Sequence, residues 1–228
     1  MNSSDTQFLG IDVGGTHLKI GLVDKEGNIL DFQKEDTRPH RENPAGFGPC
    51  FVDIIGKYLE KYPNVEKVGI GLPGMISKDR MTPLEIPAIP DLNNFPLKAN
   101  LLEKYPSIEF FMENDAAAAA IGEFYFGKGE VAENFLFITM GTGIGSALVL
   151  EGQVFKGSRG NALEMGHMLS RGNAGLETLV GRNGILRIMD NLIKSYPEKA
   201  GELVGKELGT HLLVDTAKAG NEVSLMVF

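Results

Sequence analysis

The chain has 228 residues, of which 43% are hydrophobic and 23% charged, the composition of an ordinary globular protein with one large or two small domains. Its net charge of −8 argues against binding nucleic acid or an acidic membrane surface through overall charge. The single cysteine, Cys50, excludes an internal disulfide and a cysteine-rich zinc site. A polar start without a signal pattern, and no apolar run long enough to span a bilayer, favour a cytoplasmic protein.

Two glycine-containing segments, at residues 8–30 and 135–155, share the same order of features. Each opens with Phe-Leu-x-Ile, continues through one polar residue (Asp12 or Thr139) into a glycine-rich turn, and then runs as an apolar stretch to a Glu-Gly pair. A repeat separated by more than a hundred residues indicates two halves built from one supersecondary unit.

The residues after each glycine turn determine its type. THLKIGLVD follows the first turn and SALVLEGQVF follows the second, and both runs are typical of strands. A dinucleotide-binding fingerprint would need a helix there, and the Walker pattern is absent. The sequence therefore predicts two β-hairpins whose main-chain N–H groups bind phosphate, with Asp12 at the edge of the first to hold a hydrated Mg²⁺.

The region between the hairpins alternates helix and strand. Helical spacing predicts a helix at 47–62, and the stretch VEKVGIGLPGMI (65–76) is expected to be a strand that runs into a Gly-Pro loop at Gly71–Gly74. A proline-rich connection at 80–96 leads to a second predicted helix at 95–106 and a strand at 107–114.

The stretch ENDAAAAA follows that last strand. Asn114 and Asp115 are good helix caps, and the five alanines after them favour a closely packed helix. On these residues alone, Asp115 is either a structural cap or a base at the mouth of a cleft. We expect the boundary between two domains here, with one half at 1–115 and the other at 116–228.

Five motifs taken in order resemble the ROK sugar kinases: DVGGTHLKIG, GLPG, ENDAAAAAIGE, TMGTGIGSALV and LEMGH. The resemblance covers nearly the whole chain. It implies an α/β protein with the actin-like (ribonuclease-H-like) ATPase fold, in which two α/β halves with mixed sheets enclose a cleft.

The resemblance also implies roles for individual residues. Asp115 resembles the base that takes the proton from the primary hydroxyl of a sugar as that hydroxyl attacks the γ-phosphate. The residues that resemble sugar ligands are Gly74, Asn114, Asp115, Glu164, His167 and Glu177. Those that resemble the phosphate and nucleotide site are Asp12, Gly14, Gly15, Thr16, Lys19, Gly141, Thr142 and Gly143.

The chain departs from the family pattern in three places. Met168, Ser170 and Gly175 stand where many members carry zinc-binding cysteines, so we expect no zinc. Leu163 replaces a glycine before the E-x-G-H motif. The family also continues beyond the last residues of this sequence through further helices and an adenosine-binding loop. We therefore expect either a natural or engineered truncation or a shortened member, with exposed apolar surface near Val214, Leu225 and Phe228 in either case.

The function implied by the resemblance is phosphorylation of a hexose, glucose or an N-acetylhexosamine, with ATP and Mg²⁺ as cofactors. Polyphosphate is an alternative donor, and a homodimer is one assembly consistent with the expected apolar surface. The alternative function is a sugar-binding regulator or a catalytically silent member, because the family includes repressors. Retention of Asp115 favours the kinase, since a pure binding protein needs no base.

Overall fold

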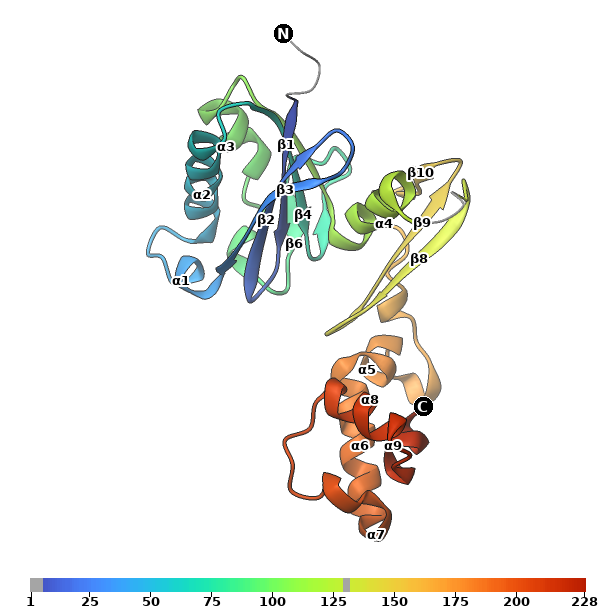
Figure 1. Cartoon of the computed structure of the whole chain (residues 1–228). Helices are drawn as coiled ribbons and strands as arrows, with labels where there is room; N and C mark the ends of the chain where they lie inside the picture. The colour runs from blue at the N-terminus through green and yellow to red at the C-terminus, as the bar shows by residue number, and fades with distance from the viewer. Residues whose placement is uncertain (1–5, 129–131) are drawn as a thin grey trace. The chain divides into compact units, whose positions relative to one another are not determined.

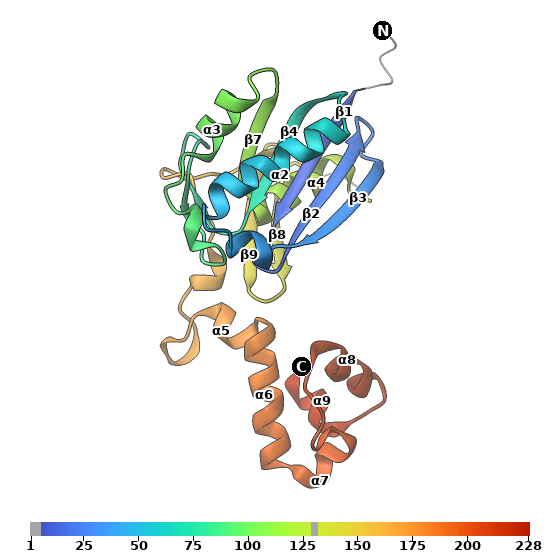
Figure 2. The same cartoon turned by 90° about the vertical axis from the view of Figure 1, so that its left-hand side faces the viewer.

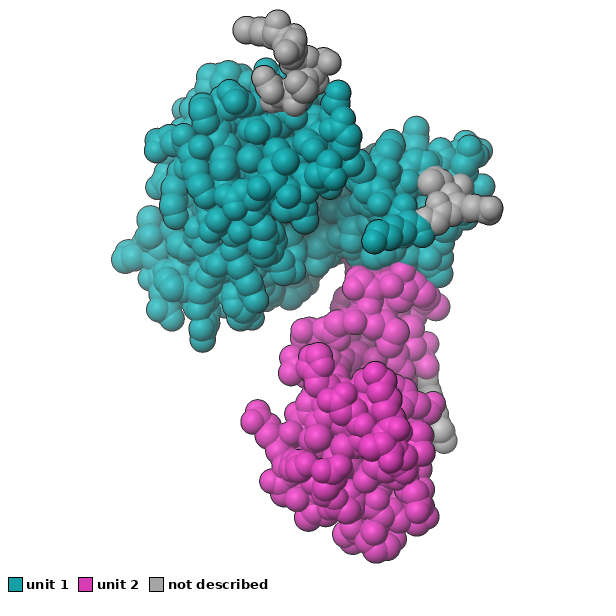
Figure 3. Space-filling model, viewed as in Figure 1, with its two compact units in different colours: residues 1–137, 147–163 teal, residues 138–146, 164–228 magenta. Residues whose placement is uncertain are grey.

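The computed structural model describes residues 6–128 and 132–228. The chain packs as two compact units, which Figure 3 shows in different colours. The larger unit contains Met1–Phe137 and Ala147–Leu163, and the smaller unit contains Ile138–Ser146 and Glu164–Phe228. The expected division at residue 115 stays a prediction.

A mixed five-stranded sheet organises the larger unit, with the order β3-β2-β1-β4-β7. Its strands are β1 (Gln7–Val13), β2 (His17–Asp24), β3 (Ile29–Asp36), β4 (Val65–Leu72) and β7 (Glu109–Asn114). The pairs β1–β2 and β2–β3 are antiparallel, whereas β4 pairs in parallel with both β1 and β7. This mixed sheet confirms the predicted α/β class.

Helices cover one face of this sheet (Figures 1 and 2). They are α1 (Arg38–Arg41), α2 (Phe47–Lys61) and α3 (Leu97–Lys104). The helical spacing that predicted α2 buries Phe51, Ile54, Ile55 and Tyr58 in the core of the larger unit. The predicted helices at 47–62 and 95–106, the predicted strand at 107–114 and the strand that runs into the loop at Gly71–Gly74 are therefore confirmed within a few residues.

The proline-rich connection folds into the core. It contains strand β6 (Pro83–Glu85), which pairs with β5 (Met75–Ile76), and a 3₁₀ turn at Pro90–Leu92. Its apolar side chains Ile86, Ile89 and Leu92 are buried with the sheet residues. These side chains fix the loop that begins at Gly74, because they cannot leave the core without exposing apolar surface.

Helix α4 (Asp115–Phe126) follows β7 directly, and its alanines pack against a second sheet. That sheet has the order β10-β9-β8 and consists of β8 (Phe135–Met140), β9 (Ile144–Leu150) and β10 (Gln153–Val154). Ala117 and Ala120 are buried in one cluster with Ala147 and Val149 of β9. Small side chains allow this close approach of a helix to a strand. The predicted repeat is confirmed, since each glycine turn opens a hairpin that a third strand follows.

The smaller unit is mainly helical. Its helices are α5 (Leu176–Val180), α6 (Arg182–Ser195), α7 (Pro197–Ala200), α8 (Thr210–Lys218) and α9 (Glu222–Val227), with 3₁₀ turns at Met165–His167, Arg171–Asn173 and Gly201–Leu203. Its core contains Met189, Leu203, Leu213 and Val223. The side chains of Val214, Leu225 and Phe228 are exposed, which confirms the expectation of apolar surface near them.

Candidate functional site

The junction of β7 and α4 brings two predicted sugar ligands together. Asn114 is the N-cap of α4, and its Oδ1 accepts a hydrogen bond from the N–H of Ala117 at 3.2 Å. Its Nδ2 donates to the carbonyl oxygen of Gly74 at 3.1 Å. Gly74 has φ +128°, and a Cβ there would overlap the carbonyl oxygen of Glu85, so only glycine fits. The structure thus places Gly74 and Asn114 in direct contact.

Asp115 is the first residue of α4 and is exposed there. Its Oδ1 accepts a hydrogen bond from the N–H of Ala116 at 2.8 Å. Desolvation by the surrounding protein is the main cause that raises the pKa of this carboxyl above its ordinary value, and the negative charge of Asp12 adds to the rise. Solvent still reaches the residue. The carboxylate is open to a ligand and more basic than a free aspartate.

Asp12 and Lys19 form an ion pair on neighbouring strands. They face each other in the β1–β2 register, with Lys19 Nζ 2.7 Å from Asp12 Oδ2, and both side chains are about half exposed. Lys19 lowers the pKa of Asp115 while Asp12 raises it. These three predicted site residues therefore act on one another electrostatically.

The first glycine turn, Gly14–Thr16, is held by its carbonyl groups. The hydroxyl of Thr37 donates to the carbonyl oxygen of Gly14 at 2.8 Å, and the N–H of Thr37 donates to that of Thr16 at 2.9 Å. Within the part of the chain that the structure describes, the N–H groups of Gly15 and Thr16 donate no hydrogen bond. Adjacent free N–H groups are what an anion-binding loop offers.

The second glycine turn, Gly141–Gly143, belongs to the smaller unit and is held by Glu177. The Oε2 of Glu177 accepts a hydrogen bond from the N–H of Ile144 at 3.0 Å. A Cβ at Gly143 would overlap this carboxylate, so glycine lets the carboxylate approach the turn. The N–H of Arg182 also donates to the carbonyl oxygen of Gly141 at 3.1 Å. In the structure, Glu177 therefore supports the turn.

Glu164 and His167 flank the 3₁₀ turn of the E-x-G-H motif, and both residues are exposed. The N–H of His167 donates to the carbonyl oxygen of Glu164 at 3.1 Å, and the N–H of Met165 donates to Ser146 Oγ at 3.2 Å. The turn is thus fixed by its backbone.

The predicted site residues fall into two groups according to unit. The larger unit contains Asp12, Gly14, Gly15, Thr16, Lys19, Gly74, Asn114 and Asp115, and the smaller unit contains Gly141, Thr142, Gly143, Glu164, His167 and Glu177. Among the residues with described placement, no three His, Cys, Asp or Glu side chains form a group that could hold a metal ion. The same residues include no helix long and apolar enough to cross a membrane.

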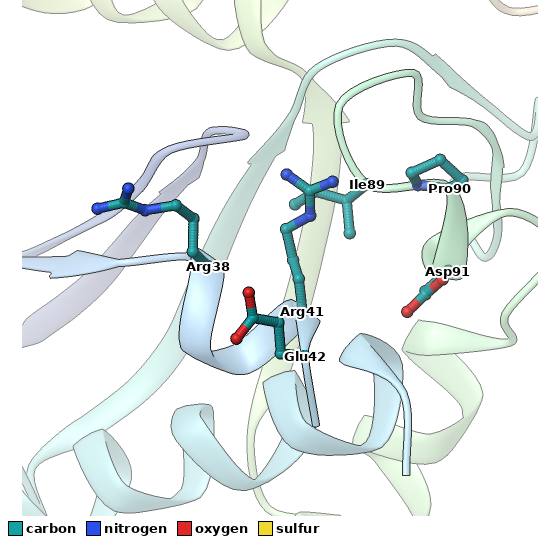
Figure 4. Close-up of a pocket in the computed structure, with 6 residues that line it drawn as sticks. All are labelled: Arg38, Arg41, Glu42, Ile89, Pro90 and Asp91. Carbon is teal, nitrogen blue, oxygen red and sulfur yellow. The ribbon is translucent and has the colours of Figure 1, made fainter. Parts of the chain in front are cut away.

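Sequence reasoning missed a pocket of about 310 Å³ beside the first glycine turn (Figure 4). The residues that line it are Arg38, Arg41, Glu42, Ile89, Pro90 and Asp91. Arg41 donates from its guanidinium to the carbonyl oxygen of Gly15 at 3.3 Å, while Arg38 pairs with Asp36. Two basic and two acidic side chains line the pocket, so it has no net preference for an anion. The part of the pocket that is visible in the sequence is the basic run TRPHR (37–41), which contains both arginines.

Residues 8–186 of this chain match the model of the ROK family. A glucokinase from Thermotoga maritima is 30% identical over 97% of this chain and 73% of its own length. A xylose repressor from Caldicellulosiruptor bescii is 27% identical over 99% of this chain and 60% of its own length. The matched glucokinases of Halalkalibacterium halodurans and Streptomyces coelicolor are covered over 62% and 49% of their length.

Solved structures agree with these relatives. The crystal structure of a candidate sugar kinase from Cytophaga hutchinsonii has a TM-score of 0.89 and 38% identity, covering 97% of this chain and 73% of that one. A ROK glucokinase from Streptomyces griseus, in complex with glucose and AMPPNP, has a TM-score of 0.78 and 28% identity. The match covers 97% of this chain and 74% of that one. These neighbours confirm the predicted actin-like fold. Because the family match covers most of its length, the chain belongs to the ROK family.

Proposed function

We propose that this chain transfers the γ-phosphoryl group of ATP to the primary hydroxyl of a hexose, with Asp115 as the general base. The observation that carries the proposal is the exposed carboxylate of Asp115 at the start of α4, next to Asn114 and with a raised pKa. A general base works best when its pKa is close to the operating pH, so a raised pKa favours this role.

In the proposed reaction the Asp115 carboxylate accepts the proton of the sugar hydroxyl as the hydroxyl oxygen attacks the γ-phosphorus. The new O–P bond forms while the bond to the oxygen that bridges the β- and γ-phosphates breaks. The products are a hexose phosphate and ADP, and the proton rests on Asp115 until solvent takes it. Phosphoryl transfer depends mainly on positioning and on neutralising charge, which fits a site with one base.

Sugar recognition is assigned to hydrogen-bonding groups in each unit. Asn114 and Gly74, in mutual contact, would bind the hydroxyl next to the transferred oxygen. Glu164 and His167, which are both exposed, would bind other hydroxyls. Glu177 keeps its predicted sugar role only if its carboxylate serves both the sugar and the N–H of Ile144. A buried sugar hydroxyl left without a partner costs about 1–3 kcal/mol, so several such groups are needed.

Phosphate binding is assigned to the two glycine turns and Lys19. The N–H groups of Gly15 and Thr16 would meet phosphate oxygens, and Gly141–Gly143 would offer a second turn. The half-exposed Asp12 carboxylate fits Mg²⁺, which proteins commonly hold through one or two carboxylates together with substrate phosphates. When bound, the metal would neutralise phosphate charge, and Lys19 would exchange its pairing with Asp12 for the phosphates.

The test is a phosphorylation assay with glucose, mannose and N-acetylhexosamines, each offered with ATP-Mg²⁺ and, separately, with polyphosphate. We expect transfer from ATP to one or a few hexoses, and glucose is our first choice because glucokinases are among the relatives. Absence of transfer to any sugar would contradict the proposal.

The same sugars should be examined by calorimetry, because a xylose repressor matches nearly the whole chain. Binding of a sugar without transfer would identify a sugar-responsive regulator instead.

A further inference from the structure

A buried ion pair that no motif predicts joins Arg80 to Glu113, the residue before Asn114. Arg80 Nε lies 3.1 Å from Glu113 Oε2, and Arg80 NH2 lies 2.9 Å from Glu113 Oε1. The two side chains are only 12% and 13% exposed. A bidentate pair of this kind fixes the relative orientation of the guanidinium and the carboxylate as well as their distance, because both groups are planar.

Arg80 also binds two carbonyl groups. NH1 donates to the carbonyl oxygen of Ser77 at 3.1 Å, and NH2 donates to that of Gly160 at 2.7 Å. Arg80 itself has φ +58°, an uncommon conformation for a residue with a side chain. The guanidinium thus binds the β5–β6 hairpin, the end of β7 and the segment at Gly160 at the same time.

The segment 156–161 makes further contacts with the end of β7 and with the same hairpin. Lys156 Nζ lies 3.0 Å from Glu113 Oε2. The side-chain amide of Asn161 accepts from the N–H of Ile76 at 3.0 Å and donates to its carbonyl oxygen at 2.9 Å. Gly160 fits because a Cβ there would lie 2.9 Å from the Cα of Lys78. This segment continues directly into Leu163 and the E-x-G-H motif.

Glu113 connects these contacts to the candidate site. Its Oε1 accepts a hydrogen bond from the N–H of Asn114 at 3.0 Å. Asn114 in turn binds the carbonyl oxygen of Gly74 and caps α4. A continuous set of hydrogen bonds therefore runs from Gly160 through Arg80 and Glu113 to Asn114.

We propose that Arg80 and Glu113 are positioning residues for the sugar: they set the orientation of Asn114 and the Gly74 loop, and so the affinity for the hexose. The inference rests on the proposed function. A role in stability alone does not require this geometry, since a buried ion pair often adds little net stability compared with an apolar pair. The fork instead sets the relative positions of three chain segments that meet at Arg80, one of which carries Asn114.

The test uses Arg80→Lys, which keeps the charge but loses the fork, and Glu113→Gln, which keeps the shape but loses the charge. The matched control is Lys67→Met, which removes an exposed pair with Glu109 on β4 and β7. Displacing a substrate-binding group by about 1 Å can cost about 100-fold in rate. We expect the KM for the hexose to rise by roughly 10- to 100-fold in both variants, while their KM for ATP stays unchanged. In the control Lys67→Met, the KM values for the hexose and for ATP should both stay unchanged. Folded Arg80→Lys protein with an unchanged hexose KM, or with equal rises for hexose and ATP, would overturn the proposal.

Amide hydrogen exchange tests the same inference without catalysis. The N–H groups of Ala117 and Ile76 donate to Asn114 and Asn161, so both should exchange faster in Arg80→Lys than in the wild type or in Lys67→Met. If the wild type phosphorylates no hexose, the proposed function fails, and this exchange measurement decides the positioning role independently. Unchanged exchange at both amides would overturn it.

Discussion

Asn114 donates a hydrogen bond from Nδ2 to the carbonyl oxygen of Gly74, which lies 40 residues earlier, at 3.1 Å. The Oδ1 of the same side chain accepts from the N–H of Ala117 and caps α4. One amide therefore joins a loop that only glycine can form to the helix whose first residue is the candidate base.

Asn114→Ala removes both the cap and the contact with Gly74. We expect the free energy of unfolding to fall by about 0.5–2 kcal/mol, as for loss of an N-cap, and the KM for the hexose to rise. Chemical denaturation and steady-state kinetics measure the two effects. Asn221→Ala is the matched control, because Asn221 caps α9 through the N–H of Ser224 at 3.0 Å. It should lower stability similarly and leave the KM unchanged. An equal rise in KM in both variants would show that loss of a cap alone explains it.

The pH dependence of kcat/KM should report the environment of Asp115. Its pKa is raised by desolvation and then by Asp12, and lowered by Lys19. The acidic limb should therefore lie above the ordinary range of an aspartate, because the base must lose its proton to work. Lys19→Met should move this limb to higher pH, and Asp12→Asn should move it to lower pH, whatever either does to the maximal rate. If the acidic limb of kcat/KM falls at the same pH in the wild type and in both variants, the group that titrates is not Asp115.

Gly143→Ala should disturb the second glycine turn. A Cβ at Gly143 overlaps the Glu177 carboxylate, so Glu177 must move and its bond to the N–H of Ile144 is lost. Because the carboxylate can swing away, the cost is mainly that of the lost hydrogen bond, and we expect a loss of stability of about 0.5–1.5 kcal/mol together with lower activity. Gly141→Ala is the control for stability, since a Cβ there meets no atom within 4 Å. Thermal melting compares the two variants. Equal melting temperatures would contradict the described packing of Glu177.

The alanine face of α4 should not accept a larger residue. Ala120 is fully buried against β9, so Ala120→Leu should destabilise the fold by about 1–3 kcal/mol through overpacking. Ala119, the preceding residue, is exposed, and Ala119→Leu should change the free energy of unfolding by less than about 0.5 kcal/mol. Urea denaturation of both variants tests this directly. Equal stabilities would mean that the run of alanines serves no close contact.

Elements with strong local signals could be predicted from the sequence. The two glycine hairpins, α2 and the cap at Asn114 follow from turn residues, helical spacing and capping chemistry. Strand β3 was missed because it ends the sheet, and its apolar residues Ile29, Leu30 and Phe32 are exposed. An edge strand without a buried face lacks the alternation that identifies strands.

Contacts between distant residues could not be predicted. Arg80 and Glu113 are separated by 33 residues, and Ile144 and Glu177 also by 33, so no local pattern links either pair. The sequence suggested Glu177 through its resemblance to a sugar ligand, whereas its contact with the N–H of Ile144 emerges only from the folded chain. The motifs predict candidate site residues, but they do not predict the groups that hold those residues in place.

The central claim is that Asp115 is the base for transfer to a hexose, and Asp115→Asn tests it most directly. The wild type and the variant should be compared for ATP-dependent phosphorylation of the preferred hexose and for binding of that hexose by calorimetry. We predict that the variant binds the sugar but loses about 10²- to 10⁴-fold in kcat. It should melt no lower than the wild type at neutral pH. A raised carboxyl pKa means that the ionised carboxylate does not favour the folded state there, and asparagine can keep the bond to the N–H of Ala116. A folded variant with wild-type kcat would contradict the account.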